Sequence, residues 1–189
     1  MIAPLPVRPS DDRLVAVLAD AGEVARAALS RLFSPGDVQL RELRVGPDVE
    51  PLPLGSLRVS LDLEGPVTAR LIVSVSRTDG LRLGDALLRR AAADTGFDEH
   101  AAAALTEMAN IAASSFLSRL ALAARRTLVP TVPALEPASA SDAALGVDWF
   151  VTARYAVTLP AGVVELSLHA APDQAFLTAL REAPTDGRG

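Results

Sequence analysis

The chain has 189 residues, half of them apolar, which is enough to bury a substantial core. Its formal net charge of −5, with no run of Lys or Arg, argues against a protein that grips nucleic acid over a broad face. The absence of cysteine excludes disulfides, thiolate metal sites and cysteine nucleophiles. No stretch approaches the roughly 18 consecutive apolar residues of a membrane-spanning helix. The first ten residues lack the apolar run of a secretory signal, so we expect a cytoplasmic protein without a membrane partner.

The first half of the chain reads as a helix, three strands and a shorter helix. Apolar residues recur at helical spacing over 13–33, and a Ser-Pro-Gly turn follows. Alternating patterns predict strands at 38–45, 56–63 and 67–76, and the last two fit an antiparallel hairpin with one face on the core. The shorter helix is expected over 81–92.

The same order then begins again. Asp98 is a suitable N-cap for a long helix over 98–125. The segment 127–137 contains three prolines, which favour an extended chain at a sheet edge because proline donates no ladder hydrogen bond. A second hairpin, expected over 147–158 and 163–170, and a last helix over 173–183 complete this half.

The order α-β-β-β-α therefore occurs twice, and the two long helices align so that Glu23 matches Glu107 and Arg26 matches Asn110. The sequence predicts one α+β domain over 1–189, built from pseudo-symmetric halves at 11–92 and 98–183. We expect an antiparallel sheet with the two long helices on one side. The termini, 1–9 and 184–189, are expected to be flexible.

The second long helix carries a polar pair in an otherwise apolar stretch. Residues three apart on a helix share a face, so Glu107 and Asn110 project together, with Ala103 one turn before and Ser114 one turn after. The expected core face is the stripe Leu105, Met108, Ile111, Ala112, Phe116 and Leu120. The pair is then exposed, and by itself it fits a solvated surface, although Asn is a poor helix former without another use.

The spacing to a later proline gives the pair more weight. From Asn110, 22 intervening residues lead to Pro133. With the duplicated order, this spacing resembles the CheC/CheX/FliY family of chemotaxis phosphatases, whose signature is (Asp or Ser)-x3-Glu-x2-Asn-x22-Pro. Glu107, Asn110 and Pro133 match that signature, whereas Ala103 stands at the Asp/Ser position.

The first half departs further from the signature. Glu23 is present, but Arg26 stands where the asparagine would be, and Val49 stands where the proline would be. The resemblance therefore implies a single candidate site, as in CheX-like members, whereas CheC-like members often keep two.

The resemblance implies an enzyme that hydrolyses the aspartyl phosphate of a CheY-like response regulator. In that reading Asn110 orients the attacking water, a task for which a neutral carboxamide is suited. Glu107 contacts the active-site lysine of the regulator and fixes the docking angle. The resemblance implies no cofactor of the chain's own, and Mg²⁺ is expected on the regulator.

Other readings stay open at this point. A non-catalytic binding module, similar to CheC or FliM, would dock a regulator or another signalling partner without hydrolysis. A CheD-like deamidase is a further possible partner, and either sheet edges or helix faces are available for a homodimer.

The remaining polar residues point to no second chemistry. His100 and His169 belong to different elements and are both expected at the surface, which makes a weak case for a metal site. Ser114 has no histidine or lysine base nearby in the sequence, so a serine nucleophile is unsupported. No Gly-rich nucleotide-binding motif occurs. Trp149 is expected in the core of the second hairpin, with Phe150 pointing the other way.

Overall fold

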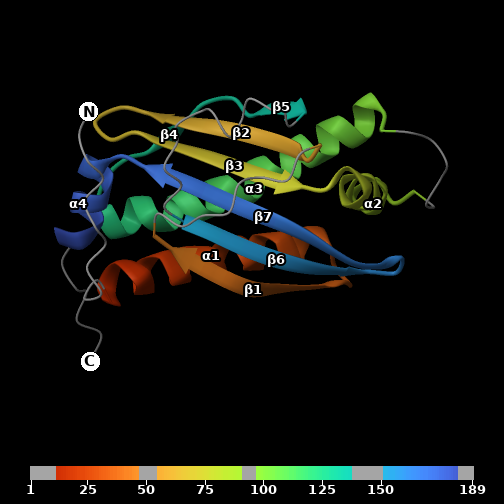
Figure 1. Cartoon of the computed structure of the whole chain (residues 1–189), viewed down its shortest axis with the longest axis horizontal. Coiled ribbons are helices and arrows are strands. Elements are labelled where there is room, and N and C mark those ends of the chain that lie inside the picture. The colour runs from red at the N-terminus through yellow and green to blue at the C-terminus, as the bar shows by residue number, and fades with distance from the viewer. Residues whose placement is uncertain (1–11, 47–54, 91–96, 138–150, 183–189) are drawn as a thin grey trace.

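A computed structural model describes residues 12–46, 55–90, 97–137 and 151–182, which form an α+β fold (Figure 1). The elements are α1 (Asp12–Leu32), β1 (Asp37–Val45), β2 (Leu57–Glu64), β3 (Ala69–Val75), α2 (Arg77–Leu87), α3 (Glu99–Ala124), β4 (Val129–Pro130), β5 (Ala134–Pro137), β6 (Val151–Leu159), β7 (Gly162–Pro172) and α4 (Gln174–Glu182). The predicted order α-β-β-β-α is present twice, with the first strand of the second half split into β4 and β5.

All the strands join one antiparallel sheet. Its order is β1-β6-β7-β3-β2-β4, and β5 also pairs with β2. The hairpins β2–β3 and β6–β7 lie side by side at the centre, through the pairing of β3 with β7. Each half gives its first strand to the other half: β1 pairs with β6, and β4 and β5 pair with β2. This exchange ties the two halves into one sheet.

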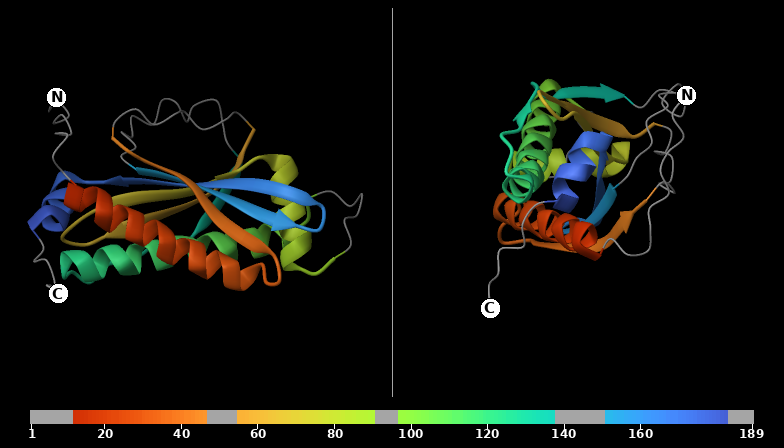
Figure 2. Two further views of the ribbon diagram at one scale, coloured as in Figure 1. Left: turned by 90° about the horizontal axis from the view of Figure 1, so that it is seen from below. Right: turned by 90° about the vertical axis from the view of Figure 1, so that its left-hand side faces the viewer.

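The two long helices cover one face of this sheet, as predicted. Figure 2 shows α1 and α3 side by side beneath the strands. Three of the seven residues buried on α1 and five of the ten buried on α3 are alanines, whose small side chains let the two backbones approach closely. An ion pair between Arg119 of α3 and Asp20 of α1 also joins them at the surface.

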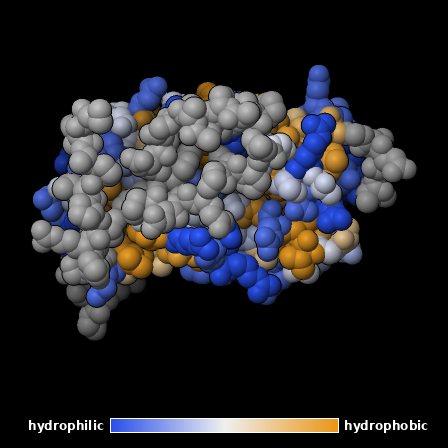
Figure 3. All heavy atoms as spheres, in the orientation of Figure 1, coloured by the Kyte–Doolittle hydropathy of each residue, from blue (hydrophilic) through white to orange (hydrophobic). Residues whose placement is uncertain are grey.

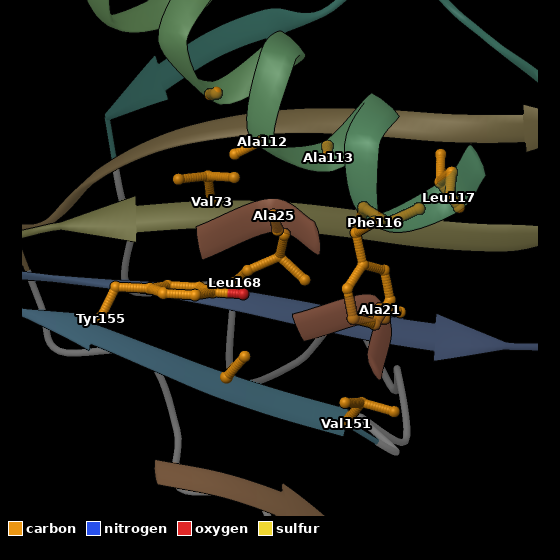
Figure 4. Close-up of a cluster of buried hydrophobic side chains, with 14 of the residues drawn as sticks. Ala21, Ala25, Val73, Ala112, Ala113, Phe116, Leu117, Val151, Tyr155 and Leu168 are labelled. Carbon is orange, nitrogen blue, oxygen red and sulfur yellow. The ribbon is translucent and has the colours of Figure 1, made fainter. Parts of the chain in front are cut away.

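The core lies between the helices and the sheet. In the close-up of Figure 4, the Phe116 ring projects from α3 toward Ala21 of α1, and Tyr155 lies beside Leu168 on the sheet. Phe116 and Tyr155 are fully buried. The Tyr155 hydroxyl donates a hydrogen bond to the Gly22 carbonyl over 3.2 Å, which satisfies its polar end. Burial, with the negative charge of Glu23, raises the pKa of Tyr155.

The short helix α2 differs from its predicted range of 81–92. It begins at Arg77, because the Ser76 hydroxyl caps it by accepting the Asp79 backbone N–H over 3.0 Å. It ends at Leu87, and Arg89 follows with a left-handed φ of 52°. Two glycines weaken the helical pattern of its first turns. One of them, Gly84, lets α2 pack closely on α3, since a Cβ there would lie 3.0 Å from the Ala101 Cβ.

The surface position predicted for His169 is wrong, because its side chain is only 5% exposed. Its neighbours Leu168 and Ala170 face the helices, so His169 points to the opposite side of the sheet. There its Nε2 lies 3.1 Å from Ser74 Oγ and its Nδ1 lies 3.0 Å from Thr152 Oγ1. The alternating apolar pattern predicts strands with one face on the core and the other in solvent. In the structure both faces of the central strands are buried. His100, in contrast, is exposed as expected.

The other boundaries agree with the predictions to within a few residues. The prediction for α3 is confirmed: the helix begins at Glu99, and Asp98 caps it by accepting the Ala101 backbone N–H over 2.7 Å. That bond and the side chain of Arg90 lower the pKa of Asp98. The predictions for Trp149 and Phe150, and those for both termini, lie outside the described residues.

The outer edge formed by β1 is strongly charged. Arg41 and Arg44 are exposed there, and Glu42 pairs with Arg44 at 2.5 Å and with Arg154 of β6 at 3.3 Å. Figure 3 shows hydrophilic side chains in the middle of this lower edge of the sheet, with hydrophobic ones to either side. Charged side chains on an edge strand oppose pairing with another chain. This feature disfavours a homodimer through β1.

Candidate functional site

Glu107 and Asn110 lie on the outer face of α3, as the sequence pattern predicts. The helix runs from its Asp98 cap to Arg125, which ends it in a left-handed conformation. The expected core stripe faces inward and is buried, except that Ile111 is half-buried. Glu107 is exposed and Asn110 is half-buried. The pair therefore stands near the middle of a long helix, where the backbone holds both side chains on a rigid support.

The two side chains differ in their internal contacts. Asn110 Oδ1 accepts a hydrogen bond from Ser114 Oγ over 3.3 Å. Glu107 makes no hydrogen bond or ion pair with any residue of the described ranges. Its carboxylate is consequently open to a cation from outside the chain.

The two other signature positions, Ala103 and Pro133, add no charge. Ala103 is exposed one turn before Glu107, so the surface there is low. Pro133 is half-buried and lies between β4 and β5, and β5 packs against α3. The proline segment thus has the extended edge position that the sequence predicts.

A small cavity adjoins α3 on its buried side. It is lined by Leu57, Val59, Val73, Leu105, Met108 and Leu135, among other apolar side chains. The cavity therefore lies between α3 and the sheet, whereas Glu107 and Asn110 lie on the outer face of the helix. An entirely apolar lining supplies no group for catalysis, so the candidate polar side chains of this helix are those on its outer face.

The matching positions on α1, Glu23 and Arg26, are paired with each other. Arg26 Nε lies 2.6 Å from Glu23 Oε2, one turn away. The same guanidinium donates through Nη1 to Ser30 Oγ and to the Val38 carbonyl, both over 3.4 Å. The carboxylate of this half is neutralised within the chain, in contrast to that of Glu107.

The described residues contain no group of three His, Cys, Asp or Glu side chains placed to hold a metal ion. Across the same ranges, no helix combines the length and the apolar character needed to cross a bilayer. The helix face of Glu107 and Asn110 is therefore the candidate site that the described structure offers.

Comparison with solved structures identifies the fold. Borrelia burgdorferi CheX, solved in complex with CheY, BeF3 and Mg²⁺, superimposes with a TM-score of 0.62 at 19% identity, over 85% of this chain and 97% of that one. Thermotoga maritima FliY gives 0.68 at 13% identity, over 95% and 98% of the two chains. The middle domain of Helicobacter pylori FliM gives 0.66 at 11% identity, over 90% and 99%. The chain has the fold of CheX, FliY and FliM.

Further structural neighbours are CheX and CheC-like proteins. At these low identities the likeness establishes the fold, and it confirms on that level the resemblance carried by the signature residues. No protein-family model and no curated protein matches the sequence. The structural neighbours include both CheX and FliM, so the likeness in fold leaves the choice between catalysis and binding to the residues of the site.

Proposed function

We propose that this chain hydrolyses the aspartyl phosphate of a CheY-like response regulator, using the outer face of α3. The observation that carries the proposal is the placement of two side chains on the outer face of α3: exposed Glu107, which has no ion pair with any described residue, and half-buried Asn110. Pro133 follows in the register of the phosphatase signature. The fold shared with CheX supports it, since B. burgdorferi CheX was solved with CheY, BeF3 and Mg²⁺.

Asn110 supplies the chemistry in this proposal. An aspartyl phosphate is an acyl phosphate with a good leaving group, so the main task is to place a water in line with the phosphorus. The water oxygen bonds to phosphorus as the bond to the aspartyl oxygen breaks, which releases inorganic phosphate and the free carboxylate. The amide of Asn110 is neutral and offers one acceptor and two donors, so it orients the water without repelling the phosphoryl oxygens.

Glu107 supplies the docking contact. A carboxylate is poorly suited to face a phosphoryl group, because both are anionic. It is well suited to pair with the active-site lysine of the regulator, and such a pair fixes orientation as well as affinity. Since Glu107 has no ion pair with any described residue, docking breaks none within those ranges. The Mg²⁺ of the reaction belongs to the regulator in this scheme.

A second candidate function is non-catalytic docking. Two observations favour it: the FliM middle domain superimposes on the chain as well as CheX does, and Ala103 replaces the Asp or Ser of the signature. H. pylori FliM was solved in complexes with FliG and with SpeE. A module of this kind would bind a regulator, or a partner such as a CheD-like deamidase, without hydrolysis.

The two functions are separated by following phosphorylated receiver domains from the source organism with and without the chain. Under our proposal, the chain shortens the lifetime of at least one receiver in proportion to its concentration. Binding to a receiver loaded with beryllium fluoride, without faster decay of any phosphorylated receiver, would establish the docking function instead.

A further inference from the structure

The hydrogen bond of Ser114 distinguishes it from other hydroxyl residues in the same helix. Thr106 Oγ1 donates to the Ala102 carbonyl over 2.8 Å, and Ser118 Oγ donates to the Ser114 carbonyl over 2.7 Å. Both follow the usual habit of helical Ser and Thr, which bond the backbone four residues earlier. Ser114 instead donates to the side chain four residues earlier, the Oδ1 of Asn110.

The corresponding serine of the first half, Ser30, also contacts the side chain four residues earlier. Ser30 Oγ accepts from the guanidinium of Arg26, the residue that stands at the asparagine position of α1. In both long helices, therefore, a serine one turn later contacts the side chain at this position. On α1 the contacted side chain is Arg26, which also pairs with Glu23. On α3 it is Asn110, whose amide we propose to orient the attacking water.

The contact has a direct effect on how the amide is presented. An unrestrained Asn side chain rotates broadly about its last torsion, so its oxygen and nitrogen exchange places. A donor on Oδ1 selects one orientation, with the oxygen toward the C-terminal end of α3 and the amide nitrogen away from Ser114. The oxygen has two lone pairs, so one stays available to a water while the two N–H groups stay available to a phosphoryl oxygen.

We propose that Ser114 is a positioning residue for Asn110, holding its amide in the orientation that catalysis needs. This inference rests on the proposed phosphatase function. It adds a residue that lies outside the Glu-x2-Asn pattern and that touches neither the water nor the phosphoryl group. One neutral hydrogen bond of this kind is worth a rate factor of about three to ten.

The test compares Ser114→Ala with Ser114→Thr, which retains a hydroxyl on Cβ, and with Ser30→Ala, the matched serine of α1. Each variant is assayed at saturating and at limiting phosphorylated receiver. We expect Ser114→Ala to lower kcat by about three- to tenfold with KM unchanged. The substitution disturbs the orientation of the Asn110 amide and leaves the docking contact of Glu107 in place. Ser114→Thr recovers most of the loss, and Ser30→Ala matches the wild type.

A second readout is independent of turnover. In ¹⁵N relaxation measurements, the side-chain amide of Asn110 should be more mobile on the picosecond–nanosecond scale in Ser114→Ala than in the wild type. Wild-type kcat together with unchanged Asn110 mobility in Ser114→Ala would overturn the inference and leave the proposed function standing. A wild-type chain that accelerates no receiver would overturn the proposed function, and this inference with it.

Discussion

Arg26 Nε lies 2.6 Å from Glu23 Oε2 on α1, at the positions that match Asn110 and Glu107 on α3. The cation that replaces the amide also neutralises the neighbouring carboxylate. Pairs of this spacing on a helix surface contribute only about 0.2–0.5 kcal/mol to stability. Under the proposed function the pair matters for docking, because α1 presents an internal ion pair where α3 presents an unpaired carboxylate and an amide.

One prediction from this difference is the binding stoichiometry. The chain should bind a single receiver, loaded with beryllium fluoride, in isothermal titration calorimetry, since Glu23 is paired with Arg26 whereas Glu107 has no ion pair with any described residue. Two equivalent receivers per chain would show that the ion pair of α1 does not close the first half.

The role of Glu107 predicts a loss of docking. Glu107→Gln removes the charge and keeps the shape, so affinity for the loaded receiver should fall by roughly ten- to a hundredfold, as expected for a charge-assisted hydrogen bond of about 1.5–3 kcal/mol. Salt should weaken binding less steeply in this variant. Glu23→Gln is the matched control and should bind like the wild type. Equal affinities for both variants and the wild type would contradict the docking role.

The burial of His169 leads us to predict that the stability of the protein depends on pH. Burial, with the positive charge of Arg154, lowers its pKa from 6.5 to about 4. A depressed pKa favours the neutral ring in the folded protein, so this contribution is fully present above pH 6.5 and is lost as the pH falls toward 4. The loss reaches about 3 kcal/mol at its lower limit. Urea unfolding between pH 7 and pH 4 measures it.

The control for that experiment separates His169 from the carboxylates, which also titrate at acid pH. His169→Asn should be less stable at pH 7, because it loses contacts with Ser74 and Thr152. Its stability should then fall less between pH 6.5 and pH 4 than that of the wild type. His100→Asn, at an exposed position, should keep the wild-type slope. Identical slopes for all three proteins would exclude His169 as a titrating group.

Phe116 predicts the largest loss of stability among single changes on α3. Its ring is fully buried between the helices and the sheet (Figure 4), so Phe116→Ala should cost about 3–5 kcal/mol. Leu122, on the same helix, is 67% exposed, and Leu122→Ala should change stability by only about 0.5 kcal/mol. Chemical denaturation of the two variants and the wild type measures both changes in the free energy of unfolding. A similar cost for the two would mean that Phe116 is not packed as described.

Much of the fold could be predicted from the sequence, because apolar residues recur at regular helical or strand spacing in most elements. The long helices and the central hairpins show regular apolar spacing, and Asp98 marks the start of α3. The start of α2 lies earlier than predicted because Gly80 looks like a helix breaker, whereas it allows close packing against Leu57 of β2. The exchange of edge strands between the halves is set by tertiary pairing, which a local pattern does not specify.

The site was predictable in part. The outward placement of Glu107 and Asn110 follows from the apolar stripe on the other side of the helix, and in the structure Glu107 is exposed and Asn110 is half-buried. The burial of His169 was not predictable, because alternation along a strand does not tell whether its second face is covered. The bond from Ser114 to Asn110 depends on rotamers, so it is visible only with side chains in place.

The most direct test of the proposed function is the single-turnover decay of a phosphorylated receiver with the wild type, Asn110→Ala and Arg26→Ala. The last variant truncates the matching position on α1. We expect the wild type and Arg26→Ala to shorten the lifetime of the phosphorylated receiver equally, and Asn110→Ala to leave it at its intrinsic value while still binding the receiver. Decay as fast with Asn110→Ala as with the wild type would contradict the assignment of catalysis to this residue.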